Sequence, residues 1–301
     1  EDINAGKSMS DARLPDWVDR QDGVHGPDGS YSPARNARVP RSGNPVYKRQ
    51  RFPDPVLGER FPPGDTVFET DAVRCWTDGD GIAVLGFKTK MNTISDGVLA
   101  GIQQAVDVAE KDFQGLVLWQ NKEPFSLGAD LTGALGSLQA GKFDDFERMV
   151  ETFQATSMRI KYSLVPVVAA VRGMALGGGC EFQMHSAKSV FALESYVGLV
   201  EAGVGLLPAG GGLKEIATRA GLAAGAGGDV FALLKPYFET VAMGKVSASA
   251  FEAKELKLAR EDDIVVFNQY ELLHVARATA RAMAEAGWRQ KLPPRQIPVA
   301  G

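Results

Sequence analysis

Two glutamates of the sequence stand in apolar surroundings, each beside a glycine-rich segment. Glu181 is flanked by Cys180 and Phe182, and Glu201 is the single charge in VGLVEAGVGLL. Burial raises the pKa of a carboxyl group, so such a side chain can exchange protons near neutral pH. Each glutamate taken alone fits an exposed or helix-capping residue. The pair favours catalysis, because two carboxylates can perform general acid–base chemistry without a metal.

Three glycine-centred segments follow predicted strands and indicate a second kind of chemistry. They are PFSLGAD (124–130), RGMALGGGCE (172–181) and VEAGVGLLPAGGG (200–212). In the middle segment the glycines precede a predicted helix, and a helix start offers unpaired N–H groups and a partial positive charge. This turn can therefore hold an anion or a developing oxyanion. The alternative is that the glycines only allow close packing of helix against strand.

Other catalytic groups find little support. The segment 172–181 matches neither a P-loop nor a dinucleotide-binding fingerprint. The three histidines lack the spacing of metal ligands, so we predict no metal site. His185 lies four residues after Glu181, and we expect it on a helix surface or in the core. Cys180 has no basic partner nearby, which predicts a buried, unreactive thiol.

The elements that must position these residues begin near residue 66. From there strand and helix patterns alternate, which predicts an α/β fold with a mostly parallel sheet. Val67–Trp76 and Ile82–Phe87 indicate a hairpin around a turn at 77–81. The other predicted strands are 115–120, 166–171 and 189–193, and the predicted helices are 95–111, 143–162, 180–186, 251–259 and 270–288.

Composition excludes several classes of protein. With 45% hydrophobic and 23% charged residues in 301, the chain is not collagen-like, a coiled coil or wholly disordered. A net charge of −4 argues against a general nucleic-acid binder. No apolar run approaches the ~20 residues that cross a membrane, so we expect no membrane span. Two cysteines cannot build a disulfide framework and fit a reducing, cytoplasmic location.

Residues 1–65 differ in composition from the rest of the chain. They hold nine of the sixteen prolines, and residues 35–51 contain six cations and no acid. We predict a Pro-rich extended linker or tether. The alternative is a docking strip for an anionic ligand or a partner domain. Residue 1 is Glu rather than Met, which is consistent with a processed product or a piece of a longer polypeptide.

Taken together, the three glycine segments resemble the crotonase (enoyl-CoA hydratase/isomerase) superfamily. They are similar to its F-x-x-G-A-D loop, its G-x-A-x-G-G-G-x-E helix start and its E-x-x-x-G-x-x-P-x-x-G-G turn, in the family's order. The resemblance implies a crotonase-like α/β spiral of ββα units at 66–260, followed by a C-terminal helical segment at 261–301 that serves oligomerisation. It also implies a homotrimer or hexamer, which the apolar residues of 272–283 support.

The resemblance also implies roles for individual residues. The backbone N–H groups of Leu127 and Gly178 would form an oxyanion hole for the thioester oxygen. Glu181 would activate the water that attacks C3, and Glu201 would deliver a proton to C2. The implied substrate-binding residues are Gly128, Ala129, Asp130 and Gly177. No separate cofactor is implied, because coenzyme A is part of the acyl-CoA thioester substrate.

The implied function is hydration of trans-2-enoyl-CoA to 3-hydroxyacyl-CoA in fatty-acid β-oxidation. An enoyl-CoA isomerase or acyl-CoA hydrolase on the same fold and a non-catalytic scaffold are the alternatives. Residues 1–65 look similar to the tether of a bifunctional enzyme, with a 3-hydroxyacyl-CoA dehydrogenase domain upstream of residue 1. Val200 replaces the family's usual proline, and 222–243 is longer than usual. In the family this stretch helps to shape the acyl pocket, so the resemblance implies no particular acyl chain length.

Overall fold

The structure is a computed structural model that describes residues 6, 15–21, 23–26, 28–52, 60–132, 136, 140–225 and 227–298. The chain divides into two compact units, Glu1–Pro63 and Gly64–Gly301. Among the described residues, no helix is long and apolar enough to cross a bilayer. All the residues implied in catalysis lie in the second unit.

The first unit contains a small antiparallel sheet where the sequence predicts extended chain. Its strands are β1 (His25–Gly26), β2 (Gly29–Ser32) and β3 (Ala37–Val39). The helix α1 (Asp16–Asp19) precedes the sheet and α2 (Pro45–Lys48) follows it. Strands of two to four residues are too short for an alternating apolar pattern to reveal them.

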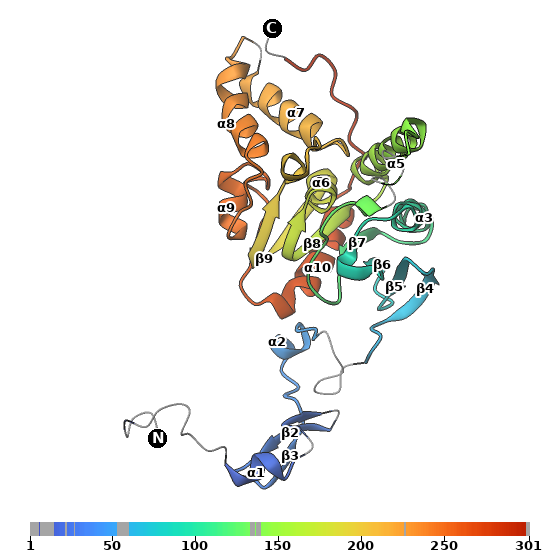
Figure 1. Cartoon of the computed structure of the whole chain (residues 1–301). Helices are drawn as coiled ribbons and strands as arrows, with labels where there is room; N and C mark the ends of the chain where they lie inside the picture. The colour runs from blue at the N-terminus through green and yellow to red at the C-terminus, as the bar shows by residue number, and fades with distance from the viewer. Residues whose placement is uncertain are drawn as a thin grey trace. The chain divides into compact units, whose positions relative to one another are not determined.

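The second unit is organised by one sheet, with the order β10-β9-β8-β7-β6-β5-β4 among the described residues (Figure 1). Strands β6 to β10 pair in parallel, whereas β4, β5 and β6 pair antiparallel. The predicted α/β class with a mostly parallel sheet is therefore confirmed. The strands are β4 (Asp65–Glu69), β5 (Val73–Thr77), β6 (Ile82–Phe87), β7 (Gly115–Trp119), β8 (Val167–Leu176), β9 (Lys188–Gly198) and β10 (Ile264–Val266).

Helices cover both faces of this sheet, which explains the continuous apolar runs in its strands. Leu118 of β7 packs in one core with α3 (Asp96–Asp112). Trp119, the next residue, packs in a second core with α10 (Leu272–Glu285). The helix α3 begins where predicted, because the Ser95 side chain accepts a hydrogen bond from the N–H of Val98.

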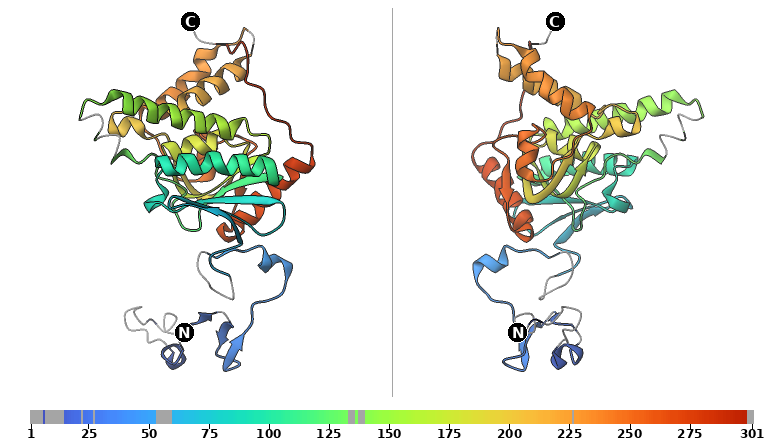
Figure 2. Two further views of the ribbon diagram at one scale, coloured as in Figure 1. Left: turned by 90° about the vertical axis from the view of Figure 1, so that its right-hand side faces the viewer. Right: turned by 60° about the vertical axis from the view of Figure 1, so that its left-hand side comes forward.

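Two further helices carry the site. The amphipathic α5 (Phe143–Lys161) lies beside α3 and packs against α6 (Gly178–His185), as the views in Figure 2 show. Both helices agree with the sequence prediction. The helix α6 directly follows β8, so the glycines between them form the strand-to-helix turn.

The first predicted strand is wrong as a single element. The chain turns between Glu69 and Val73, and β4 pairs antiparallel with β5. Thr70 causes the turn, because its hydroxyl accepts hydrogen bonds from the N–H groups of Ala72 and Val73. The strand-like pattern of the sequence continues through this turn, so the turn could not be seen in the sequence.

Strands β8 and β9 are longer than predicted. The sequence suggests that β8 ends at Arg172-Gly173, yet it continues to Leu176. Gly173 has a φ of +63°, and the register between β8 and β9 shifts beside it. Glycine takes up this irregularity, so the strand continues to the glycine turn before α6.

The C-terminal part of the second unit is mainly helical. It contains α7 (Gly212–Ala224), α8 (Val230–Ala242), α9 (Ala250–Glu255), a 3₁₀ helix η4 (Gln269–Glu271) and α10. The apolar residues of α10 that suggested oligomerisation are buried against the sheet of the same chain. Exposed aromatic residues lie instead on α8, where Phe231 and Phe238 are 64% and 69% exposed.

Candidate active site

The two glutamates line one pocket of about 490 Å³, although they come from different elements. Glu181 lies on α6, and Glu201 begins the 3₁₀ helix η3 (Glu201–Val204) after β9. Five of the other predicted site residues also line this pocket, namely Leu127, Gly128, Ala129, Gly177 and Gly178. The structure thus brings together the three glycine segments that are separate in sequence.

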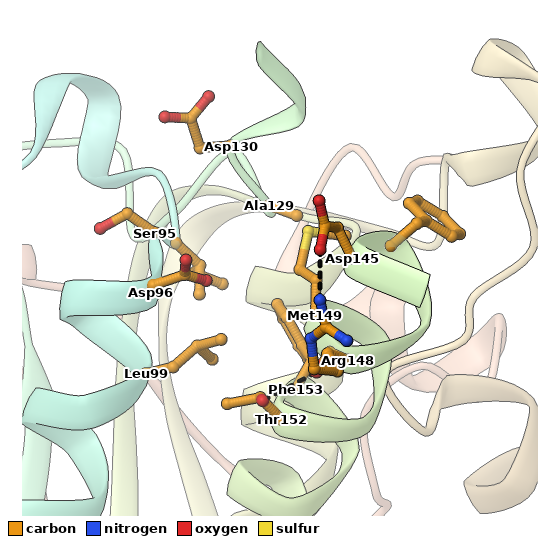
Figure 3. A pocket seen from close by; sticks show the side chains of 12 residues that line it. Ser95, Asp96, Leu99, Ala129, Asp130, Asp145, Arg148, Met149, Thr152 and Phe153 are labelled. Carbon is orange, nitrogen blue, oxygen red and sulfur yellow. Dashed lines mark hydrogen bonds and ion pairs between the residues drawn. The ribbon is translucent and has the colours of Figure 1, made fainter. Parts of the chain in front are cut away.

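Asp130 is the predicted site residue that does not line this pocket. It lines a neighbouring cleft of about 590 Å³ between α3 and α5. Figure 3 shows Asp96 and Leu99 on the α3 side and Met149 and Phe153 on the α5 side of this cleft. Ala129, Met149 and Phe153 border both hollows, so Asp130 lies next to the glutamate pocket rather than in it.

Glu181 is almost completely buried, with 3% of its surface exposed. Its Oε1 accepts a hydrogen bond of 2.8 Å from the N–H of Gly212. Burial and then the negative charge of Glu201 raise the pKa of Glu181 to about 8, although the N–H groups of Gly210, Gly211 and Gly212 act in the opposite direction. Glu181 is therefore poised to exchange a proton near neutral pH.

Glu201 is the more open member of the pair, but its carboxyl group is also enclosed. Burial raises its pKa, while the N–H groups of Val200 and of Glu201 itself lower it. Its Oε2 is buried and has no hydrogen-bond partner within the described part of the chain. The other oxygen lies against Gly177, where an added Cβ would be 3.4 Å from Oε1. A side chain at residue 177 would therefore crowd this carboxyl group.

Two backbone N–H groups in the pocket wall remain available to a ligand. The N–H of Gly128 is used by the Ser126 hydroxyl at 3.1 Å. Within the described residues, the N–H groups of Leu127 and Gly178 have no acceptor in the protein. Their loops touch, since a Cβ added to Gly128 would lie 3.1 Å from the nitrogen of Gly178. The two donors therefore belong to adjoining backbone segments beside the glutamates.

The glycines before Glu181 also serve close packing, the alternative considered for the sequence. A Cβ on Gly178 would lie 2.4 Å from the Phe153 ring, and one on Gly179 would lie 2.7 Å from the Ser126 carbonyl oxygen. Real side chains do not reach such distances. The same glycines thus bring α6 against its neighbours and place Gly178 in the pocket wall.

Burial also settles the state of Cys180. Its side chain is fully buried, and burial raises the pKa of its thiol well above the usual range. The thiol is therefore unreactive at neutral pH, as predicted. Among the residues that the structure describes, no group of three His, Cys, Asp or Glu side chains could hold a metal ion.

Two contributions to the site could not be assigned from the sequence. The loop 210–212 supplies the N–H groups around Glu181, although the sequence marked its glycines without linking them to that residue. The helix α5 supplies the apolar side of the pocket through Phe146, Met149 and Phe153. The amphipathic pattern predicted the helix, although it could not show which apolar residues face a ligand rather than the core.

Comparison with known proteins agrees with this arrangement. Residues 77–236 match the family model described as enoyl-CoA hydratase/isomerase. A Bacillus subtilis protein described as a 3-hydroxyacyl-CoA dehydrogenase is 40% identical over 211 residues, which are 70% of this chain and 26% of that protein. A Rickettsia felis protein described as a fatty acid oxidation complex trifunctional enzyme is 38% identical over 132 residues, or 44% of this chain and 18% of that protein. The chain thus spans about a quarter or less of the length of these relatives.

Solved structures show the same fold. An enoyl-CoA hydratase from Bacillus anthracis superposes with a TM-score of 0.55 at 23% identity, covering 71% of this chain and 76% of that one. An enoyl-CoA hydratase from Polaromonas sp. JS666 gives a TM-score of 0.59 at 21% identity, covering 71% and 77%. Together with the motif spacing and the family model, these likenesses support a crotonase-like fold for the second unit.

Proposed function

This chain belongs to the enoyl-CoA hydratase/isomerase family, and from that premise we propose that it adds water to trans-2-enoyl-CoA to give 3-hydroxyacyl-CoA. One observation carries the proposal: buried Glu181 and half-buried Glu201 line one pocket with two unpaired backbone N–H groups. Hydration of a conjugated thioester needs one base, one acid and a site for negative charge on the carbonyl oxygen. The pocket offers each of these.

Water addition proceeds through the glutamate pair. Ionised Glu181 takes a proton from water as its oxygen attacks C3, and protonated Glu201 gives its proton to C2. We place both carboxyl groups on one face of the bound double bond, so that H and OH add to the same face. A proton then returns from Glu181 to Glu201 and restores the starting state.

The surroundings of the two glutamates let one proton move between them, and the proposed mechanism uses the form in which Glu201 holds it. The loop N–H groups favour ionised Glu181, although burial and the charge of Glu201 outweigh them and raise its pKa to about 8. The unpartnered, buried Oε2 of Glu201 favours the protonated form, because burial penalises an uncompensated charge. The two carboxyl groups are close enough for Glu201 to raise the pKa of Glu181, so they hold one proton between them near neutral pH.

The N–H groups of Leu127 and Gly178 provide the third function. As water attacks C3, negative charge moves onto the thioester oxygen, and two fixed donors stabilise it without reorganisation. Loss of one such donor costs on the order of 2.7–4 kcal/mol in other enzymes. Because these donors belong to the backbone, the leucine side chain at 127 does not prevent the role.

A spectrophotometric assay tests the proposal. Loss of the conjugated thioester absorbance is followed with crotonyl-CoA and a C10 analogue. We expect turnover by the wild type and a fall in kcat of roughly 10²–10⁴-fold in Glu201→Gln, because general acid catalysis is lost. Glu194→Gln on β9, an exposed glutamate, is the matched control and should retain activity.

The same assay separates hydration from the other reactions of this fold. If the 2-enoyl thioester is not consumed, two other results identify the reaction. Conversion of 3-enoyl-CoA would indicate an isomerase, and release of free coenzyme A from saturated acyl-CoA would indicate a hydrolase. If neither reaction occurs and a partner binds through residues 35–51, the chain is a scaffold. Full activity in Glu201→Gln would remove the role assigned to that residue.

We also propose the setting of this reaction. The longer relatives, named for dehydrogenase and trifunctional activities, support a covalently linked 3-hydroxyacyl-CoA dehydrogenase in a cytoplasmic fatty-acid oxidation enzyme. The enzyme needs no separate cofactor for hydration. We further propose a homotrimer or hexamer, for which the exposed aromatic residues of α8 offer apolar surface. A monomer by light scattering at micromolar concentration would contradict the assembly.

A further inference from the structure

We propose that His185 is a positioning residue for Glu181. In its neutral form it ties the helix that carries Glu181 to the loop 210–212 that donates hydrogen bonds to the Glu181 carboxyl group. The inference rests on the proposed function, because it assigns one more residue to the same site.

The first contact of His185 lies within α6. Its side chain is fully buried, and Nδ1 is 2.7 Å from the main-chain oxygen of Glu181. A carbonyl oxygen can only accept, so Nδ1 carries the hydrogen and donates it. The ring is thereby attached to the backbone of the residue whose carboxyl group lines the pocket.

The second contact leaves α6 and reaches α7. Nε2 lies 3.0 Å from Nζ of Lys214. Because Nδ1 carries the hydrogen, Nε2 of the neutral ring accepts from this ammonium group. Burial, together with a smaller effect of Lys214, lowers the pKa of His185 to about 4 against the opposing effect of Glu215. The ring is therefore neutral at physiological pH, and its tautomer is fixed by its two partners.

An ion cluster around buried Glu215 holds Lys214 in place. Its Nζ lies 3.0 Å from Oε1 of Glu215, which also pairs with Lys161 of α5. Burial would raise the pKa of Glu215. In the acid range where Glu215 titrates, His185 is also protonated, and its charge and those of the two lysines outweigh burial and lower the pKa of Glu215 to about 2. Glu215 thus stays ionised, and the cluster joins α5, α6 and α7 at the His185 ring.

The ring also packs directly on the loop that supports Glu181. A Cβ added to Gly211 would lie 2.7 Å from both Cε1 and Nε2 of His185, so the loop backbone rests against the ring. The carbonyl of Gly211 accepts a 2.9 Å hydrogen bond from the N–H of Glu215. The next residue, Gly212, donates to Oε1 of Glu181 at 2.8 Å. His185 therefore contacts both the backbone of Glu181 and the loop that holds its side chain.

Loosening this contact has a defined consequence. The charges that face Glu181 and His185 are Glu201 from η3, Lys214 and Glu215 from α7, and Lys161 from α5. Without the ring, the loop N–H groups hold the carboxylate less well, so the pKa of Glu181 rises. A displacement of about 1 Å in a catalytic group can cost ~10²-fold in rate. Substrate binding, which uses other parts of the pocket, changes less.

The test compares His185→Leu with His185→Asn in the full chain. Leucine keeps most of the volume but neither hydrogen bond, whereas asparagine places a donor near the position of Nδ1. With crotonyl-CoA we expect kcat to fall roughly 10- to 10²-fold in His185→Leu with KM within about threefold, and Asn to recover part of the rate. The alkaline limb of the pH–rate profile should move upward. His274→Leu on α10, an exposed position, is the matched control.

A second measurement does not depend on activity. The pKa of Glu181 is followed by ¹³C NMR with labelled glutamate, with Glu181→Gln to assign the signal. We expect a rise in His185→Leu, and the same direction in Lys214→Met, which tests the network if His185→Leu does not fold. If the wild type hydrates no thioester but this pKa still rises, the positioning role stands and the proposed function fails. Unchanged kcat and unchanged Glu181 pKa in the folded variants, even with lower thermal stability, would overturn the inference.

Discussion

At the scale of single residues, the proposed roles of the glutamate pair predict that activity depends on pH from both sides. Hydration needs one ionised and one protonated carboxyl group, so kcat/KM should follow a bell-shaped curve. At low pH both groups are protonated and no base remains. Above about pH 8, the value to which burial and Glu201 raise the pKa of Glu181, both are ionised and no acid remains. A profile that stays flat to pH 10 would contradict the shared proton.

The same burial makes Glu181 costly for stability. In the unfolded chain its carboxyl group ionises near 4.5, but in the folded chain only near 8, so rising pH between these values favours unfolding. Glu181→Gln removes this titration. At pH 8.5 we expect the free energy of unfolding to rise by on the order of a few kcal/mol, which is seen as a higher thermal unfolding temperature. At pH 4.5 we expect a much smaller change. An equal change at both values would refute the argument, and Glu194→Gln provides the control.

The residues of the site differ in how far the sequence reveals them. Glu181 and Glu201 can be found because an isolated charge in an apolar run is unusual. Leu127 and Gly178 are implied only by the family resemblance, since a backbone N–H leaves no mark in side-chain chemistry. The part played by His185 could not be predicted at all. It depends on the contact between α6 and the loop before α7, which only the folded chain brings together.

At the scale of elements, the turn between β8 and α6 is the most constrained part of the site. Gly179→Ala would place a Cβ 2.7 Å from the Ser126 carbonyl oxygen, which is backbone and cannot rotate away. We expect a loss of about 1–3 kcal/mol in unfolding free energy, typical of overpacking, together with reduced kcat. Chemical denaturation measures the loss. Gly203→Ala, at an exposed glycine with no heavy atom within 4 Å of the added Cβ, should leave stability nearly unchanged.

Elements with a clear period or a continuous apolar run were predictable, whatever their length. The helices α3 and α5 and the strand β7 are of this kind, whereas the 13-residue helices α7 and α8 were not predicted. The strand β10 has three residues, and nothing in Ile264–Val266 separates it from a loop. Its position at the sheet edge comes from pairing with β9. The turn at 70–72 was missed for a different reason, because it interrupts the strand without interrupting the alternation.

At the scale of the whole molecule, the chain spans only part of its longer relatives. We therefore expect mass spectrometry of the natural protein to find a polypeptide much heavier than the 32.2 kDa of these 301 residues. The added mass should contain a dehydrogenase sequence. Immunoblotting of a cell extract with an antibody against the second unit measures the mass of the natural polypeptide in the same way. A mature polypeptide of 32.2 kDa that begins at Glu1 would exclude the covalent link.

The packing of α10 bears on how the chain folds during synthesis. This helix covers one face of β6, β7 and β8 through Leu272, Leu273, Ala276 and Ala280, yet it leaves the ribosome long after those strands. Until then that apolar face lacks the cover that α10 provides, and contacts so distant in sequence form slowly. Such intermediates aggregate readily. Demand for chaperones should therefore be greatest in the interval between completion of β9 and emergence of α10.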